Sequence, residues 1–235
     1  MSQATAVRAA VPKTTTSASA LLTCGVIAGP LFIVVAFAQV FTRSGFELAR
    51  HPLSLLSLGD LGWLQITNFV LAGLLFIASS VGMRRRLGGH PGGTWGPRLM
   101  GVFGVSLIAG GVFLADPAFG FPPGSPPGAP DQLSWHGIAH ASAPAIGFSA
   151  LIASAFALAR WYSRAGQRGW SAFCVVTGAV VLLLSMWPNL GGDPEGRFGP
   201  LWAAMVLGFG WASAIAGQLR SPIAIDSARV IAEDR

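Results

Sequence analysis

Six long apolar segments dominate the sequence and restrict the folds that it can adopt. Each is close to the roughly 20 residues that a helix needs to cross a lipid bilayer. They cover residues 20–41, 63–83, 97–115, 135–158, 169–187 and 199–219. Charged residues make up only 10% of the chain, whereas a soluble domain has about 25%. We therefore predict an all-α polytopic membrane protein with six transmembrane helices in one bundle, which excludes a soluble enzyme and a disulfide-rich secreted module.

The positions of the basic residues predict how the bundle is oriented. Of the 15 basic residues, all but Lys13 are arginine, in a chain rich in alanine and glycine, which is typical of a GC-rich bacterial genome. Cytoplasmic loops of membrane proteins carry an excess of Lys and Arg. With a cytoplasmic N-terminus, only Arg43, Arg50 and Arg197 face outward. We therefore expect both the N- and C-termini to be cytoplasmic and the protein to lie in the bacterial inner (plasma) membrane.

The chain divides into three regions on this topology. Residues 1–19 are polar and are expected to be a disordered cytoplasmic N-terminus, residues 20–220 form the transmembrane domain, and residues 221–235 form a cytoplasmic tail. The sequence pI of about 11.0 does not indicate a nucleic-acid partner, because the arginines lie in short loops between apolar segments, where they set topology. The expected partner is the lipid bilayer.

Polar side chains within the apolar segments gather near the predicted outer ends. Such groups are costly in a bilayer and by default mark functional sites. They predict an outward-facing polar pocket, beneath the outer loops, that binds a lipid or small molecule. The residues assigned to this pocket are Gln39, Gln65, Asn68, Trp135 and Asn189.

Two histidines form the most specific motif. His136 and His140 are four residues apart, so on a helix they point the same way, as two metal ligands would. A catalytic zinc site needs about three protein ligands, and His51 could supply the third. Asp116 could then act as the base or orient a ligand, and Ser54 could help to bind an oxyanion. Two alternatives stay open: helix-end histidines hydrogen-bonded to loop carbonyls or lipid headgroups, and ligation of haem or a quinone.

Glycine and proline mark close packing and kinks within the segments. Gly25 and Gly29 form a GxxxG motif, which fits either close packing within the chain or dimerisation. Pro30 and Pro144 lie inside predicted spans and should kink them. Because Pro144 follows His140 by one turn, its kink could open space beneath the histidines.

The first outer loop carries a family resemblance. The stretch His51–Gly59 (HPLSLLSLG), followed by Gly62–Gln65 (GWLQ) and Asn68–Phe69, resembles the signature of the domain-of-unknown-function 998 (DUF998) membrane family. Asp116-Pro117 and the His136 to His140 segment fit the same pattern. The resemblance covers roughly residues 20–220 and implies a six-span integral membrane protein, but it implies no activity.

A weaker similarity is to the alkaline ceramidase and adiponectin-receptor superfamily of membrane hydrolases. That similarity implies zinc and a lipid-amide substrate, with Ser54, His51, Asp116, His136 and His140 supplying the same residue types. This chain departs from that pattern, since it has six predicted spans rather than seven and His51 precedes the serine in a loop.

Three functions remain as hypotheses on this evidence. The first is a multi-pass protein that binds a lipid or small molecule. The second is a zinc-dependent hydrolase of a lipid-like amide or ester. The third, a transporter, is disfavoured because the inner halves of the segments carry almost no polar groups and no internal repeat is visible.

Overall fold

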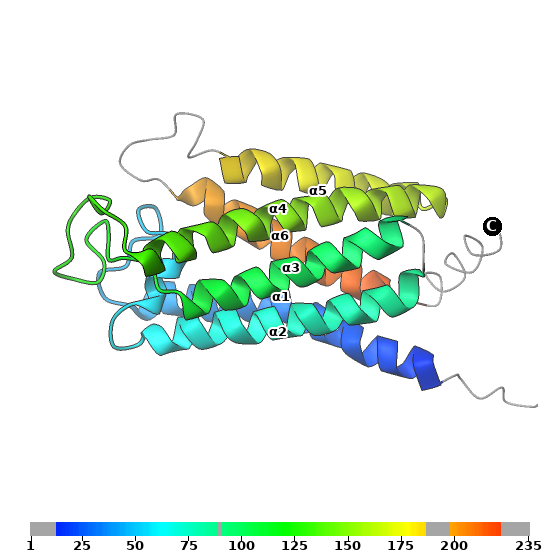
Figure 1. Cartoon of the computed structure of the whole chain (residues 1–235), viewed down its shortest axis with the longest axis horizontal. Helices are drawn as coiled ribbons and strands as arrows, with labels where there is room; N and C mark the ends of the chain where they lie inside the picture. Colours follow the sequence, from blue (N-terminus) through cyan, green and yellow to red (C-terminus); the bar gives the residue numbers. More distant parts are fainter. Residues whose placement is uncertain (1–12, 89–90, 187–197, 222–235) are drawn as a thin grey trace, which may run out of the picture.

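The computed structural model describes residues 13–88, 91–186 and 198–221, and these residues form a helical bundle. A short 3-10 helix, η1 (Leu53–Ser57), lies in the loop between the first two helices. The long helices are α1 (Lys13–Thr42), α2 (Gly62–Leu87), α3 (Pro91–Val112), α4 (Trp135–Arg164), α5 (Arg168–Met186) and α6 (Gly199–Gln218) (Figure 1). The predicted all-α class is confirmed.

Five of the described helices are long and apolar enough to cross a membrane: α1, α2, α4, α5 and α6. The α3 helix is not among them, because its first two turns contain three glycines, two prolines and Arg98. It nevertheless packs along α2 on one side and α4 on the other. The protein is therefore a multi-pass helical membrane bundle, and α3 is held within it by its neighbours.

The helices form a closed ring in chain order. Each helix packs chiefly against the helix before it and the helix after it, and α6 returns to pack against α1. Successive helices run in opposite directions (Figure 1). The α5 helix is the least buried of the six, since only Cys174, Gly178 and Val181 are buried on it.

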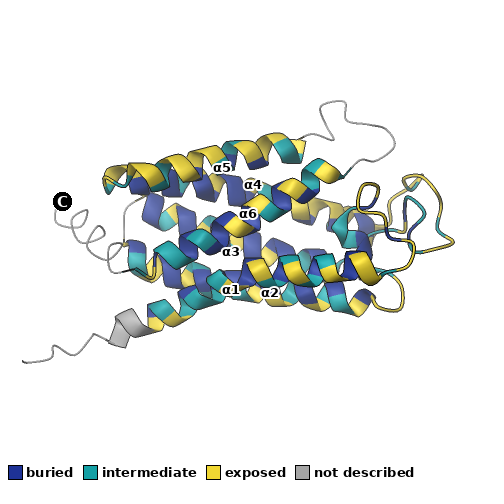
Figure 2. Cartoon of the chain, turned by 180° about the vertical axis from the view of Figure 1, so that it is seen from behind, coloured by how far each residue is buried: buried dark blue, intermediate teal, exposed yellow. Residues whose placement is uncertain are grey.

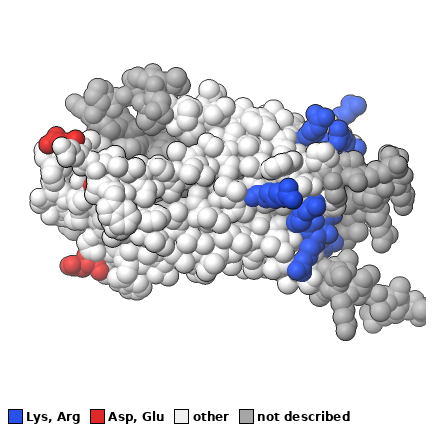
Figure 3. Space-filling model, viewed as in Figure 1, with Lys and Arg blue, Asp and Glu red and all other residues white. Residues whose placement is uncertain are grey.

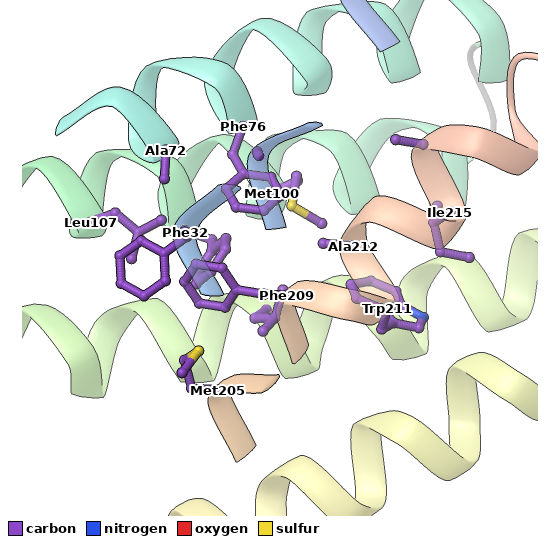
Figure 4. Close-up of a cluster of buried hydrophobic side chains, with 14 of the residues drawn as sticks. Phe32, Ala72, Phe76, Met100, Leu107, Met205, Phe209, Trp211, Ala212 and Ile215 are labelled. Atoms are coloured by element: carbon purple, nitrogen blue, oxygen red, sulfur yellow. The ribbon is translucent and has the colours of Figure 1, made fainter. Parts of the chain in front are cut away.

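The ring encloses an aromatic core at mid-height. Phe32, Phe76, Phe103 and Phe209 are almost fully buried, with neighbouring ring centroids 4.6–5.6 Å apart. Figure 4 shows Phe32, Phe76 and Phe209 meeting between the helices. Large apolar side chains also cover the outer faces of the helices, where exposed and intermediate residues predominate (Figure 2), as expected of a surface in contact with lipid tails.

The seam between α1 and α6 is closed by the GxxxG motif. The Ser213 hydroxyl donates to the carbonyl of Gly25 (2.8 Å) and accepts from the N–H of Gly29 (3.2 Å). A Cβ atom on Gly29 would lie 2.5 Å from the carbonyl oxygen of Phe209. Of the two interpretations of this motif, packing within the chain is the one observed here.

Charged side chains lie at the two ends of the bundle, and most of the described arginines lie at one of them. The described arginines visible in Figure 3 gather at one end, whereas the visible carboxylates lie at the other. We call the first the arginine-rich end; it includes Arg84, Arg85, Arg86 and Arg164. We call the opposite end, with residues 43–61 and 113–134, the loop end. The assignment of the arginine-rich end to the cytoplasm stays a prediction.

Candidate functional site

His51 holds the two described loops of the loop end together. Its ring is buried, and its Nδ1 accepts from the backbone N–H of Glu47 (2.8 Å). The proton of the neutral ring is therefore on Nε2, which donates to the carbonyl of Phe119 (3.0 Å). The carbonyl of His51 in turn accepts from the indole N–H of Trp202 (3.1 Å) on α6. His51 thus connects residues 43–61, residues 113–134 and α6 through backbone groups.

Arg43 fixes η1 over the end of the bundle. Its guanidinium donates to the carbonyls of Leu56 (3.1 Å) and Leu58 and lies over the ring of Phe121. Partial burial lowers the pKa of Arg43, and Asp60 raises it in part. Because arginine stays protonated in proteins, these contacts persist at every pH at which the protein folds.

Asp116 joins the end of α3 to the start of α4. Its carboxylate accepts from the backbone N–H (2.8 Å) and the hydroxyl (2.6 Å) of Ser134. The Ser134 hydroxyl also accepts from the N–H of Gly137 (3.0 Å) and so caps α4. A Cβ atom on Gly137 would lie 2.1 Å from the carboxylate, which explains the glycine. The contacts of Asp116 serve helix capping, and its catalytic role stays a prediction.

We expect Asp116→Asn to lower the free energy of unfolding by about 0.5–2 kcal/mol. The asparagine amide has only one acceptor atom, and the substitution removes a negative charge near the N-terminus of α4. Thermal unfolding in detergent, followed by circular dichroism, measures the change. Asp131→Asn, at an exposed position in the same loop, is the matched control. Equal melting temperatures for the two variants would contradict this role of Asp116.

His140 caps α3 from the opposite direction. Its Nδ1 lies 2.7 Å from the carbonyl of Phe113, and the Gly110 carbonyl also interacts with the ring. Carbonyls at the C-terminus of a helix have no later helical N–H to pair with. Because a carbonyl only accepts, Nδ1 carries the proton, and the neutral ring keeps a lone pair on Nε2. The side chain is 7% exposed, and the hydrogen bonds of the described residues include none to Nε2.

The His140 ring lines a cavity of about 110 Å³ in the half of the bundle nearest the loop end. Its floor is the top of the aromatic core, and η1 with the preceding proline lies over it. Polar side chains are few, and the described lining residues include no Asp, Glu, Lys or Arg. Apart from the Trp202 indole, the polar side chains of the lining are Ser54, Ser106 and His140.

The side walls of the cavity come from α4 and α6. The α4 wall is Pro144, Gly147 and Phe148, and the α6 wall includes Leu201 and Met205. Figure 4 shows Met205 beside Phe209 and Leu107 beside Phe32, all of which line the cavity. The sequence does not mark these apolar wall residues as part of a site, because nothing in it distinguishes them from ordinary core residues. Only the spacing of Pro144 after His140 pointed to them.

The predicted pocket residues Gln39, Gln65 and Asn68 lie between α1 and α2 and are not among the described lining residues. Gln65 Oε1 accepts from Gln39 Nε2 (2.7 Å) and from Asn68 Nδ2 (3.3 Å), and Asn68 also donates to the carbonyl of Phe32 (3.1 Å). All three residues are buried, and each keeps one polar atom without a partner. Side-chain amides that bond across helices in this way hold transmembrane helices together.

The remaining predicted site residues are not in the cavity lining either. Trp135 is 66% exposed at the start of α4, and exposed His136 stacks on it with ring centroids 3.5 Å apart. This pair suits the membrane interface, where aromatic residues gather. Asn189 lies outside the described residues. Of the predicted residues, the cavity therefore brings together Ser54 and His140.

The structure does not place His51, His136 and His140 as one set of metal ligands. Within residues 13–88, 91–186 and 198–221, no three His, Cys, Asp or Glu side chains form a group that could hold a metal ion. Both ring nitrogens of His51 bind backbone groups, and a ligating nitrogen must be free to face the metal. The interpretation of the histidines as partners of carbonyls matches the contacts of His51 and His140, so the zinc site gains no support from this geometry.

Fold and cavity together define a polytopic helical membrane protein with a largely apolar internal cavity. The chain belongs to the family described as "Protein of unknown function (DUF998)", whose pattern matches residues 26–219. This match confirms the first resemblance seen in the sequence. The similarity to ceramidase-like hydrolases finds no such support. No curated protein matches the chain, and no solved structure matches it.

Proposed function

We propose that this protein binds the apolar part of a lipid or other small amphiphile in the cavity beneath η1. The observation that carries the proposal is the cavity itself, about 110 Å³ of space beneath η1. Small-molecule sites are concave and mostly apolar, with a few polar groups that orient the ligand. His140, Ser54 and Ser106 are such groups here.

The position of the cavity favours binding over transport. Below it, Phe76, Phe103 and Phe209 pack ring against ring across the middle of the bundle. A transporter needs a binding site that can open toward either side, and these aromatic rings separate the cavity from the arginine-rich end. On the predicted topology the arginine-rich end faces the cytoplasm, so the cavity lies in the outer half of the inner membrane.

Gly110 offers a way to fill the cavity without disturbing its walls. It lies on α3 and lines the cavity, and the nearest atom to a Cβ built on it is 4.0 Å away, on the ring of Phe69. Leucine at this position would therefore project into free space. Gly210 on α6 is the matched control, because nothing lies within 4 Å of a Cβ there and it is exposed.

We expect Gly110→Leu to reduce ligand capture at least about tenfold, as expected when a side chain takes the space of the ligand. The probe is a ten-carbon alcohol with a photoreactive diazirine in its chain, added to the protein in neutral-lipid nanodiscs. After irradiation, mass spectrometry should find the label on cavity segments of α4 and α6 in the wild type and in Gly210→Leu. Labelling of those segments that is unchanged in Gly110→Leu, or absent from the wild type, would refute the proposed function.

A further inference from the structure

We propose that the cavity selects uncharged amphiphiles that carry a hydrogen-bond donor, as a long-chain alcohol does. This inference rests on the proposed function and names the class of ligand for that site. It follows from three features of the described lining: the protonation of His140, the backbone at Pro144 and the absence of charged side chains.

The His140 ring presents an acceptor to the cavity. Its Nδ1–H is committed to the Phe113 carbonyl, so the neutral ring has only the lone pair of Nε2 to offer a ligand. The side chain is more than nine-tenths buried and lines the cavity. Nε2 is not among the fully enclosed polar atoms of the described residues that lack a partner, so a hydroxyl group in the cavity can reach it and donate a hydrogen bond to it.

Pro144 leaves one backbone carbonyl of α4 without its usual helical partner. In a helix, the N–H of residue 144 would bond the carbonyl of residue 140, and proline has no N–H. The carbonyl of His140 therefore lacks its usual helical partner. Pro144, one turn later in α4, also lines the cavity.

The other polar side chains fit the same ligand. The Ser106 hydroxyl donates to the carbonyl of Phe103 (2.7 Å) and so has only lone pairs left to offer. The Ser54 hydroxyl can both donate and accept, which matches an alcohol. Two of the three polar side chains therefore act toward a ligand as acceptors.

Charged headgroups are disfavoured by what the lining lacks. Among the described lining residues there is no Lys or Arg to pair with an anion and no Asp or Glu to pair with an ammonium group. Burying a charge without a partner is far more costly than burying a neutral hydroxyl. An anionic headgroup would also face the lone pair of Nε2.

Three probes that differ only at one end test this inference: the diazirine alcohol, its methyl-ended hydrocarbon and its sulfonate, which is ionised at every usable pH. We expect the alcohol to label the cavity segments at least about tenfold more than either analogue at equal membrane concentration, the scale of one buried hydrogen bond. For every probe that enters the cavity, labelling of the cavity segments should be lower in Gly110→Leu than in the wild type.

His140→Leu is the decisive variant, because leucine carries no hydrogen-bonding atom, whereas an asparagine here would still present its Oδ1 as an acceptor. We expect the alcohol to lose most of its advantage over the hydrocarbon in this variant, with a lower melting temperature because the Phe113 carbonyl loses its partner. Equal labelling by alcohol and hydrocarbon in the wild type, or preference for the sulfonate, would overturn the inference and leave the cavity proposal standing. Absence of cavity labelling by any probe would overturn both.

Discussion

Gly29→Val should unfold at much lower denaturant than the wild type, with an expected loss of about 2–5 kcal/mol, the sum of overpacking and a broken buried hydrogen bond. A Cβ atom on Gly29 would lie 2.5 Å from the backbone oxygen of Phe209 and 2.5 Å from the hydroxyl of Ser213. The backbone of α6 cannot move aside as a flexible side chain can. We therefore expect α6 to separate from α1 and the hydrogen bonds of Ser213 to break.

Titration with sodium dodecyl sulfate, followed by tryptophan fluorescence and circular dichroism, measures this loss. Gly210→Val is the matched control, because it adds the same side chain to a helical glycine with nothing within 4 Å. We expect the control to stay within about 0.5 kcal/mol of the wild type. A Gly29→Val protein as stable as the control would show that the α1–α6 seam does not close the bundle.

His51→Ala should be the second most damaging substitution, with an expected loss of about 1–3 kcal/mol, because two part-buried backbone groups lose their partner. Those groups are the N–H of Glu47 and the carbonyl of Phe119. The rings of Phe46 and Phe121 also lose their contact with the imidazole, from which their centroids lie 5.1 and 5.5 Å away, measured to the centroid of the His51 ring. Thermal unfolding in nanodiscs measures the change in stability.

The control for His51 is His136→Ala, at an exposed position, which should change stability by no more than about 0.5 kcal/mol. Treating the wild type with a chelator tests the other role assigned to His51. Because its contacts are with backbone, the melting temperature should not change on chelation. A chelator effect as large as that of His51→Ala would restore a metal role for this residue.

The sequence predicts the helices well and their mutual arrangement poorly. Apolar length locates α1, α2, α4, α5 and α6, because a long apolar segment in a bilayer satisfies its own backbone hydrogen bonds by forming a helix, whereas α3 falls short of that measure. Apolar length does not show that Ser213 on the last helix bonds Gly25 and Gly29 on the first, because contacts between distant segments leave no local pattern. The weak hydropathy of α3 at its start, around Arg98, likewise gives no hint that two neighbours hold it in place.

The candidate site was predicted in part, and the reason lies in side-chain direction. His140 and Ser54 do line one cavity. Gln65 and Asn68 were grouped with them by depth in the membrane, yet depth does not say which way a side chain points around the helix. Both turn toward α1. His51, in a loop without periodicity, gave no signal that loop backbone would use both of its ring nitrogens.

The closed ring has a consequence for how the protein is made. A ribosome delivers the helices in the order in which they are packed, so each new helix finds its partner already in the membrane. The exception is α1, whose second partner is α6, the last of the described helices to be synthesised. Until then Gly25 already packs against Ser79 of α2, but Gly29 has no α6 backbone beside it, and the hydroxyl of Ser213 arrives about 185 residues later. Completion of the bundle therefore waits until α6 has been synthesised, and a chain truncated before α6 would leave Gly29 open to other helices in the membrane.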